Sequence, residues 1–505
     1  MIMKVDKLTR MLIRPSYARC NILVSRNLAS ESPKPFEDVP GLKALPIIGV
    51  LHHFLPIFGT VGIQQNFFNM FNILERKYGP IVKVDGIFGR GTLVLFFEPD
   101  HFDKIYRAEE TNPLRPGAQA LDYYREVLRK DRFDGVYGLT SAQGEKWRDF
   151  RTKVNPALLK PKLVKLYTPG LEEIAEDAVA RLLRLKDESY GTLSEEFGTE
   201  ITKWSLESVA LVALGSRMGC LQDGLPEDHP SHTLTYCSRN IADLMYKLEF
   251  IPHWNKERST NFKKMMEIYD LQWDVSAMYI DQAKKRIQER GHDIPEEDQS
   301  VLEKLLAIDE RVAVMMANEM LLAGIDTVAF TTIGLLYHLA TNQAAQDKVR
   351  QEIREQKGAR YLKACLKESL RLMPVLPANL RQTSKEHVVG GYIIPKGVFA
   401  IAPNENLSKS EKHYVRATEF IPERWLVEKS DPLFYGNTHP MVTLPFGFGV
   451  RSCIGRRIAE LEIEIFTKKL LNTVRVTWNG PPLQVVTKLM NEHKKPFHFQ
   501  FETLD

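Results

Sequence analysis

Helical periodicity dominates the middle of this 505-residue chain and is the feature that most limits its fold. Apolar residues recur at three-to-four spacing in segments that predict helices at 144–155, 170–186, 196–215, 232–247, 259–290, 311–340 and 343–370. Strand-like runs are short and lie nearer the two ends, at 81–85, 92–97, 388–394, 398–401, 474–478, 483–486 and 497–501. The first two flank Gly86–Gly89 and predict a hairpin. We therefore expect a mainly α fold with small β-sheets.

No internal repeat or low-complexity linker divides residues 31–505, so we expect them to form one domain. The 68 basic and 64 acidic side chains are too evenly balanced for a protein whose partner is a nucleic acid. The 5 cysteines contain no C-x-x-C pair and lie too far apart in the chain for a zinc cluster. This cysteine usage fits a reduced, intracellular compartment.

Residues 1–30 are rich in basic side chains and contain a single acidic one, Asp6. This pattern, without the apolar core of a secretory signal, predicts a mitochondrial presequence, and a frayed basic tail is the alternative. Residues 44–74 carry no formal charge, a run long enough to cross a bilayer. Prolines, glycines and polar side chains interrupt it, so we expect a surface loop and helix that dips into one leaflet without spanning the membrane.

A glycine-rich segment at 446–457 precedes a helix that we predict at 457–471. Cys453 therefore lies just before a helix N-terminus, which together with Arg451 favours a thiolate over a thiol. A thiolate is a strong axial ligand for haem iron, and Gly449 and Gly455 would let the backbone approach a flat macrocycle. The alternative is a buried core cysteine beside a glycine turn.

The segment resembles the haem-binding signature of the cytochromes P-450, which it matches at Phe446, Gly449, Arg451, Cys453 and Gly455. The resemblance extends from Pro40 to the C-terminus. It implies a single-domain cytochrome P-450 fold with haem b between the Cys453 loop and the helix that carries Asp326 and Thr327. Cys453 would then be the ligand of the iron.

That helix contains Ala323-Gly324-Ile325-Asp326-Thr327 in an otherwise apolar stretch. The small Ala323-Gly324 pair would let a ligand lie close to the backbone, and a buried Asp326 needs a compensating purpose. Proton delivery by Asp326 and Thr327 is the functional interpretation, and a kinked helix with a satisfied threonine is the alternative. The resemblance implies that this helix activates oxygen.

Two further motifs follow the family's pattern. Glu368 and Arg371 lie at i and i+3 on one helix face, a spacing that alone indicates a surface ion pair of little energy. The resemblance instead implies a buried structural network of Glu368, Arg371 and Arg424 that supports the cysteine loop. It also implies that the haem carboxylates are held by the residues Trp147, Arg151, Arg381 and Arg451. For Arg381, an ordinary surface arginine is the alternative.

Basic residues before Glu368 and after Cys453 form a candidate docking patch, Lys363, Lys367, Arg456 and Arg457. Charge spacing alone favours a solvated helix face. The patch resembles that of the animal mitochondrial members of the family, in which such residues dock an acidic ferredoxin. The resemblance implies an adrenodoxin-like ferredoxin with its NADPH-dependent reductase as electron donor, at the matrix side of the inner mitochondrial membrane.

The expected reaction inserts one atom of O2 into a lipophilic substrate. The segment with Trp204, Leu206–Ala213 and Gly219-Cys220-Leu221 resembles arthropod mitochondrial members, which favours a foreign compound over an ecdysteroid or sterol. The family's layout places the substrate lining at 114–133, the helix before Asp326, 330, 375–378 and 487–490. Two alternatives stay open. They are a haem-thiolate isomerase or dehydratase that needs no electron donor, and a haem protein without catalytic activity.

One segment departs from the family. Between Val349 and Tyr361 one helical pattern passes into the next with only Gly358 as a breaker, where the family usually has an additional connecting segment. A splice variant or a faulty gene model would explain the difference. Either would put the packing near Lys363 in question.

Overall fold

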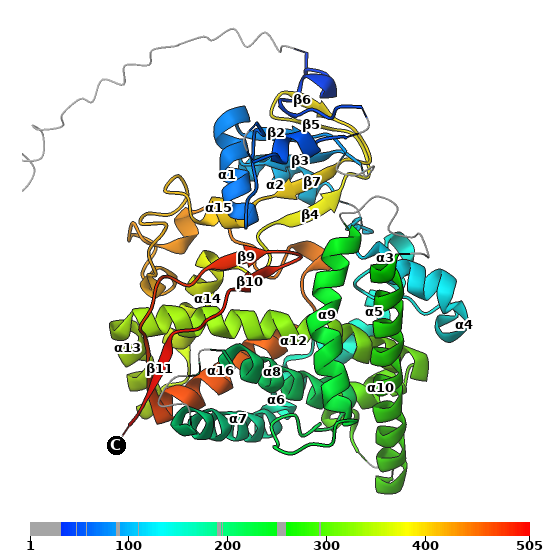
Figure 1. Ribbon diagram of the computed structural model, residues 1–505, viewed down its shortest axis with the longest axis vertical. Coiled ribbons are helices and arrows are strands. Elements are labelled where there is room, and N and C mark those ends of the chain that lie inside the picture. Colours follow the sequence, from blue (N-terminus) through cyan, green and yellow to red (C-terminus); the bar gives the residue numbers. More distant parts are fainter. Residues whose placement is uncertain are drawn as a thin grey trace, which may run out of the picture.

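A computed structural model describes residues 32–504 except 47, 57, 87–90, 110, 189–192, 194, 250–258 and 292–293. The predicted presequence lies outside the described residues, so its presence stays a prediction. Helices make up most of the described chain, and the strands gather mainly at one end of it (Figure 1). The mainly α fold with small sheets is confirmed.

Most of the helices lie below the upper group of strands in Figure 1, and a few lie beside those strands. Their bounds are α1 (Phe67–Tyr78), α2 (Pro99–Arg107), α3 (Gln119–Tyr123), α4 (Lys130–Phe133), α5 (Gly144–Leu158), α6 (Pro161–Leu166), α7 (Thr168–Glu188), α8 (Phe197–Leu214), α9 (Pro230–Glu249), α10 (Thr260–Arg290), α11 (Val301–Leu306), α12 (Glu310–Thr341), α13 (Gln343–Arg354), α14 (Arg360–Leu372), α15 (Asn404–Ser408) and α16 (Arg456–Thr473). Every predicted helical segment is helical, but 343–370 is divided into α13 and α14.

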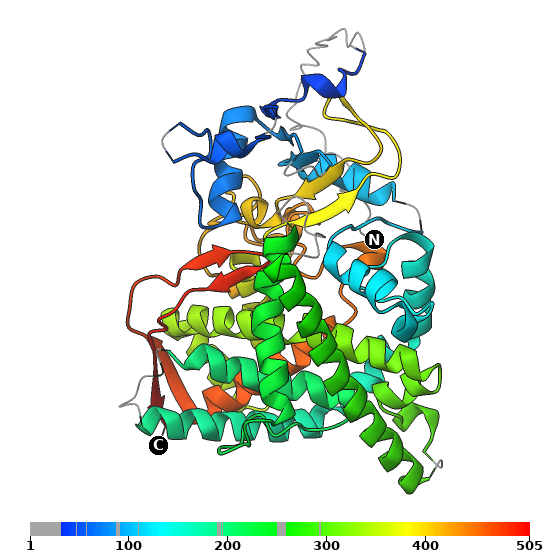
Figure 2. The same ribbon diagram turned by 45° about the vertical axis from the view of Figure 1, so that its right-hand side comes forward.

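The central helix is α12, which packs on α8, α10, α14 and α16. Asp309 caps its start by accepting a hydrogen bond from the Arg311 amide at 2.7 Å. A helix that is apolar on nearly all faces must be buried on nearly all of them. Within the described residues α12 is also the helix long and apolar enough to cross a membrane, but 56% of its most apolar window is buried inside the protein. Next to it α9 and α10 run side by side (Figure 2).

The largest sheet has the strand order β1-β2-β3-β7-β4. Its strands are β1 (Gly41–Leu42), β2 (Ile81–Val84), β3 (Leu93–Phe96), β4 (Asn379–Gln382) and β7 (Phe399–Ala402). The predicted hairpin is present, because β2 and β3 are antiparallel with Val82 opposite Leu95. The pair β3 and β7 is parallel, and the pair β7 and β4 is antiparallel. The sheet therefore joins strands from the first hundred residues to strands from residues 379–402.

Three small sheets complete the fold, and they differ in detail from the predicted strands. The run 388–394 is a hairpin of β5 (His387–Val389) and β6 (Tyr392–Ile394), because Gly390 and Gly391 turn the chain at positive φ. The segments near 483 and 497 belong to different sheets. β9 (Val485–Thr487) pairs with β10 (Asn491–His493), whereas β11 (Phe499–Thr503) pairs with β8 (Val474–Trp478). β10 has no apolar alternation, so it could not be predicted from local pattern.

Residues 44–74 form the predicted surface loop and helix. Beyond a short 3-10 turn at Leu51–Phe54, this stretch contains the beginning of α1, which Asn66 caps by accepting from the Asn69 amide at 2.9 Å. Several large apolar side chains face outward here, among them Phe58 at 89% and Ile63 at 74% exposure. An exposed apolar patch of this kind favours contact with another surface.

The connection between α13 and α14 closes without any additional segment. Gln356 and Gly358 adopt positive φ and reverse the chain within five residues, 355–359. The Glu352 carboxylate then accepts hydrogen bonds from the Tyr361 amide at 2.9 Å and the Leu362 amide at 3.1 Å. These are first-turn amides of α14 that have no acceptor within the helix. The short segment therefore leaves the helix that carries Lys363 regular.

A fully buried carboxylate, Glu368, joins α14 to the long segment that follows α15. Its Oε1 accepts from Arg371 Nη2 at 2.7 Å and from Arg424 Nε at 2.8 Å, and its Oε2 accepts from the Trp425 indole at 2.9 Å. Arg371 also donates to the Ser408 carbonyl at 2.6 Å. Each of Glu368, Arg371 and Arg424 is 0% exposed. The three predicted residues do meet in a buried network, and the surface ion pair is excluded.

We expect Glu352→Ala to lower the free energy of unfolding by about 1–2 kcal/mol, because it leaves two first-turn amides of α14 without an acceptor. Urea denaturation followed by far-UV circular dichroism measures the change. Glu355→Ala is the control, since Glu355 lies in the same turn and has only exposed partners, Lys357 and Gln351. Equal midpoints for the two variants would contradict the capping role.

Candidate active site

The Cys453 loop turns back on itself just before α16 begins. The Cys453 amide donates to the Phe446 carbonyl at 2.9 Å, and the Ser452 amide donates to the Gly449 carbonyl at 3.0 Å. The Cys453 side chain is exposed, whereas the other described cysteines, Cys220, Cys237 and Cys365, are buried. The loop therefore presents one thiol outward from its own backbone, and a buried core cysteine is excluded at this position.

Two glycines give this loop its shape. Gly447 at φ +75° and Gly449 at φ +65° both take the left-handed conformation, which residues with a Cβ rarely adopt. Gly449 was predicted to shape the loop but Gly447 was not, although the repeated Phe-Gly pattern is a signal for it. Gly455 has φ −84°, and a Cβ there would meet nothing within 4 Å. Gly455 is thus not required by the backbone, and its role toward haem stays a prediction.

Desolvation by the surrounding protein raises the pKa of the Cys453 thiol, although solvent still reaches the side chain, and several groups act in the opposite direction. The amide of Gly455 and the guanidinium groups of Arg151 and Arg115 lower this pKa. From its position in the sequence, Arg451 was expected to favour the thiolate. The cations with a marked effect on this pKa are Arg151, predicted only to hold the haem carboxylates, and Arg115, which was not singled out.

The side chains of Arg115, Arg151, Arg381 and Arg451 form a guanidinium cluster beside Cys453. Burial and the repulsion of the other three arginines lower the pKa of Arg451 to about 8. A carboxylate partner is present in Glu109, whose Oε1 lies 2.7 Å from Arg381 Nε. Burial raises the pKa of Glu109 to about 7 despite this contact. The cluster therefore holds more cations than it has anions to balance them.

The protein fixes these arginines from several directions. The Arg451 guanidinium stacks on the Trp147 ring at 3.9 Å and donates to the Ala142 carbonyl at 3.0 Å. Arg151 Nη2 donates to the Ser452 carbonyl at 3.0 Å, while its Nε is buried and has no hydrogen-bond partner among the described residues. All four residues predicted to hold carboxylates thus lie near the Cys453 loop, since Arg381 Nη2 also donates to a loop carbonyl, at 3.0 Å.

One face of α12 is open although most of the helix is buried. Ala323 is exposed and Thr327 is partly exposed, one turn later on the same face. The Thr327 hydroxyl donates to the Ala323 carbonyl at 2.7 Å. Asp326 accepts from the Ser238 hydroxyl of α9 at 2.9 Å, and burial raises the pKa of its carboxyl group. Ser238 had no signal in the sequence, because its partner lies 88 residues away.

Gly324 faces a neighbouring helix. A Cβ at this position would lie 2.8 Å from Cγ2 of Val209 on α8, so the glycine lets α8 pack closely on α12. This packing role accounts for Gly324 by itself, and a role toward haem stays a prediction. Ala323 is the member of the small pair that borders the open face.

The segments expected to line the substrate chamber come together around α12. The Asn491 amide donates to the Val375 carbonyl at 2.8 Å, which ties the β9–β10 hairpin to the segment after α14. His493 Nε2 lies 3.0 Å from the Phe330 carbonyl oxygen of α12, which ties the same hairpin to the central helix. Asn491 and His493, in the strand that the sequence did not reveal, thus assemble three of the predicted lining segments.

The basic residues predicted to dock a partner lie on α14 and α16. Lys363 Nζ is 3.2 Å from Glu464 of α16, and Lys367 Nζ lies 5.7 Å from the centroid of the Trp425 ring. At the start of α16, Arg456 pairs with Glu460 and Arg457 donates to the Leu159 carbonyl. The two helices are thus in contact, but acidic neighbours partly balance the patch.

A family model described as cytochrome P-450 matches residues 39–500, which is most of the chain. The chain belongs to the cytochrome P-450 family. Among curated relatives, cytochrome P-450 CYP12A2 of Musca domestica is 36% identical over 501 residues, covering 94% of this chain and 92% of that protein. The probable mitochondrial cytochrome P-450 12b2 of Drosophila melanogaster is 35% identical over 467 residues, covering 89% and 85%.

A solved structure, the haem domain of cytochrome P450DA, has the same fold with a TM-score of 0.70. The match between the two structures covers 94% of this chain and 98% of that domain, at 19% sequence identity. As a cytochrome P-450, the protein is a monooxygenase whose cofactor is haem, with its iron held by a thiolate. The two carboxylates of haem match the excess of cations beside Cys453, and the open face of α12 offers a surface for a flat macrocycle. The residues present therefore fit this cofactor.

We expect Cys453→Ala to abolish the red-shifted Soret band that a reduced, carbon-monoxide-bound haem shows with a thiolate ligand, because no other described cysteine is exposed. Difference spectroscopy of the purified holoprotein measures it. Cys220→Ala and Cys237→Ala, which remove buried thiols, should keep the band. A band that survives in Cys453→Ala would exclude Cys453 as the ligand.

Proposed function

We propose that this cytochrome P-450 oxidises a lipophilic small molecule in the mitochondrion with electrons from a ferredoxin. Two reducing equivalents, two protons and one O2 yield a hydroxylated product and one water. The observation that carries the proposal is the joint placement of the outward Cys453 thiol, the guanidinium cluster and the open α12 face with Asp326 and Thr327. The mitochondrial placement draws support from relatives whose names include that word, such as cytochrome P-450 12a5 of Drosophila melanogaster.

When bound, haem supplies oxygen activation at its iron. In this proposal the thiolate of Cys453 would hold the iron, and Trp147, Arg151, Arg381 and Arg451, joined by Arg115, would hold the carboxylates. Thr327 and Asp326 would deliver protons from α12, where the Thr327 hydroxyl donates to the Ala323 carbonyl at 2.7 Å. Asp326 accepts from Ser238 at the interface between α12 and α9, and Thr327 follows it in the sequence.

The substrate is assigned by class. Apolar and aromatic side chains, among them Leu121 and Tyr124, make up the core cluster that α12 shares with the segment before α5. Such surroundings favour an apolar molecule over a charged one. By similarity to arthropod relatives, a foreign lipophilic compound is our preferred substrate over an ecdysteroid or sterol. The exposed apolar side chains at 45–63 would let the enzyme rest on the inner mitochondrial membrane, from which such a substrate can enter.

The competing functions are less well supported. A haem protein without activity would be favoured by a distorted proximal side, but the short 355–359 connection is closed and the Glu368 network is complete. An isomerase or dehydratase would have no use for a proton-delivering hydroxyl or for an electron donor. Product formation without NADPH, reductase and ferredoxin would establish that alternative.

We expect Thr327→Ala to keep normal haem content but to lower the product formed per NADPH consumed severalfold, because the variant lacks the proton-relay hydroxyl. The diverted O2, two electrons and two protons should appear as hydrogen peroxide. Thr331→Ala is the matched control, since its hydroxyl donates to the Thr327 carbonyl in the same way one turn later, at 2.7 Å. Equal coupling in Thr327→Ala and the parent would remove Thr327 from the reaction.

We expect the double variant Lys363→Glu/Lys367→Glu to accept electrons from an acidic mitochondrial ferredoxin at least about tenfold more slowly at low salt, because charge reversal opposes encounter. Binding by the parent should itself weaken as salt rises, since exposed charges are screened within about 8–10 Å at physiological ionic strength. Stopped-flow reduction of the haem measures the rate.

Lys284→Glu is the control for this experiment, because Lys284 belongs to α10, which lies away from α14 in Figure 1, and is paired with Glu310 at the start of α12. Haem content should be unchanged in all variants. The ferredoxin assignment fails if the double variant is reduced as fast as the parent, or if a microsomal flavoprotein reductase supports faster turnover.

A further inference from the structure

A buried ion pair joins the segment before α5 to the central helix. Arg125 Nη1 lies 2.5 Å from Glu319 Oε1 of α12, and the two side chains are 7% and 4% exposed. The other oxygen of Glu319 accepts from the Thr140 amide at 2.9 Å and from the Thr140 hydroxyl. Arg125 Nη1 also lies 3.4 Å from the Ser141 hydroxyl. The Glu319 carboxylate thus binds both Arg125 and Thr140, which belong to two separate parts of the 119–142 segment.

Gly138 lies between Arg125 and Thr140 in the sequence, and its missing side chain leaves the space that the ion pair occupies. A Cβ placed on Gly138 would lie 2.2 Å from Arg125 Nη1 and 2.2 Å from Glu319 Oε1. Side chains cannot approach that closely, and neither atom can move without breaking the ion pair. Gly138 has no positive φ, so the demand for glycine here is one of space and not of backbone conformation.

The position of Glu319 on α12 relates the pair to the open face of that helix. Residues 319, 323 and 327 follow one another at intervals of four and therefore lie on one face. Glu319 precedes the exposed Ala323 by about 6 Å along the helix axis, at 1.5 Å per residue. The segment that Arg125 and Thr140 belong to is thereby fixed at the edge of the open face.

The same segment has a second, more exposed attachment. Asp270 of α10 accepts hydrogen bonds from the Tyr124 hydroxyl at 2.9 Å, from Arg129 Nε at 2.9 Å and from Arg132 Nη1 at 2.9 Å. Asp270 is 22% exposed in its side chain, so water competes for these contacts more than at Glu319. The segment therefore bridges α10 and α12, and its better protected anchor is the one beside Ala323.

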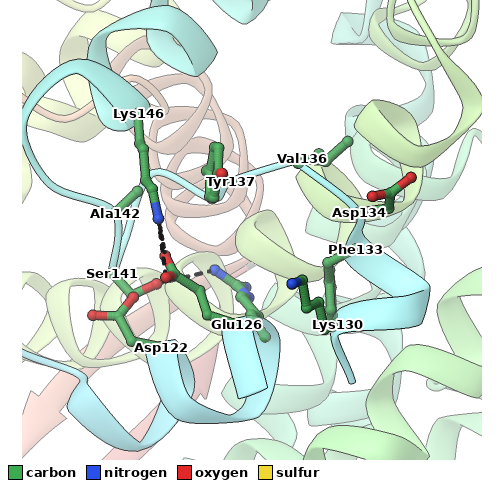
Figure 3. A pocket seen from close by; sticks show the side chains of 13 residues that line it. Asp122, Glu126, Lys130, Phe133, Asp134, Val136, Tyr137, Ser141, Ala142 and Lys146 are labelled. Atoms are coloured by element: carbon green, nitrogen blue, oxygen red, sulfur yellow. Dashed lines mark hydrogen bonds and ion pairs between the residues drawn. The ribbon is translucent and has the colours of Figure 1, made fainter. Parts of the chain in front are cut away.

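Water reaches the outer side of the buried pair. A cavity of about 250 Å³ is lined by residues of the 122–146 segment, including Arg125, Gly138 and Ser141. Figure 3 shows Lys146 reaching across this cavity to Glu126, while Ser141 lies beside that pair. Arg125 Nε is buried without a partner among the described residues. Separation of the pair would thus admit water without disrupting the apolar core.

We propose that Arg125 and Glu319 form a clasp that holds the 119–142 segment against α12 and so closes the substrate chamber over the open face. Buried ion pairs contribute little net stability compared with apolar pairs, and fixing the register of two elements is their best attested use. Both are positioning residues and touch no reacting atom. The proposal rests on the proposed function, because it takes the open face of α12 to border the chamber.

Hydrogen exchange of the holoprotein tests the clasp without turnover. Arg125→Met and Glu319→Gln should each raise amide exchange in residues 134–142 by at least about tenfold, with exchange in α14 and α16 unchanged. Gly138→Ala should do the same, since its methyl group separates the pair while leaving both charges. Arg125→Lys retains a cation and should restore part of the protection. The double variant Arg125→Met/Glu319→Gln should be no worse than either single variant.

Lys146→Met is the matched control, because it removes a pair on the same cavity whose side chains are 48% and 42% exposed. Its exchange should change less than about twofold. Spectral titration supplies the second measurement. The clasp variants should bind 4-phenylimidazole at least about fivefold more weakly than the parent, and imidazole with unchanged affinity, because only the larger ligand needs the chamber wall.

Unchanged exchange in Arg125→Met and Glu319→Gln would overturn the clasp. Faster exchange with unchanged 4-phenylimidazole affinity would also overturn it, since the segment would then not form the wall. A parent protein that binds no haem would instead overturn the proposed function, so the two failures are distinguishable.

Discussion

The buried Glu368 carboxylate is the interaction on which the rest of the structure depends. It accepts hydrogen bonds from Arg371, Arg424 and Trp425, and Arg371 in turn holds backbone carbonyls of the segment that leads to the cysteine loop. That segment has little regular secondary structure. Side-chain hydrogen bonds therefore bind its backbone carbonyls, which in a helix or sheet would be bound by backbone amides. Removing one member would leave a fully buried charge unpaired, which is strongly destabilising. The network therefore has to form completely for the loop to be placed at all.

A second constraint is the imbalance of charge around Cys453. Four guanidinium groups lie close together, and Glu109 balances them only weakly. Their mutual repulsion is unfavourable unless further anions bind beside them. Haem supplies two carboxylates, so folding and cofactor binding stabilise each other. The same reasoning applies on α12, where an exposed Ala323 interrupts a buried helix. In the proposed site, haem would cover both of these features.

Much of the architecture could be predicted from local patterns. The amphipathic helices were found because their period repeats over many residues, and the β2–β3 hairpin because two strand-like runs flank a glycine turn. Strand β10 could not be found, since its three polar residues show no apolar alternation and the contacts that place Asn491 and His493, with Glu405 and Phe330, come from far away in the chain. The split of 343–370 was likewise decided by Glu352, which reaches forward to cap α14.

The sequence by itself determined the chemistry: one thiol in a glycine loop, an acid and hydroxyl in an apolar helix, and the charged pairs whose spacing the family shares. Only the tertiary structure decided which neighbours act on those groups. Arg115 and Arg151, and not Arg451, lower the pKa of Cys453, Ser238 holds Asp326, Val209 occupies the space beside Gly324, and Arg125 meets Glu319 across 194 residues. The physical reason is that hydrogen bonding, repulsion and close packing depend on distance in space, which sequence spacing fixes only within a single helix or strand.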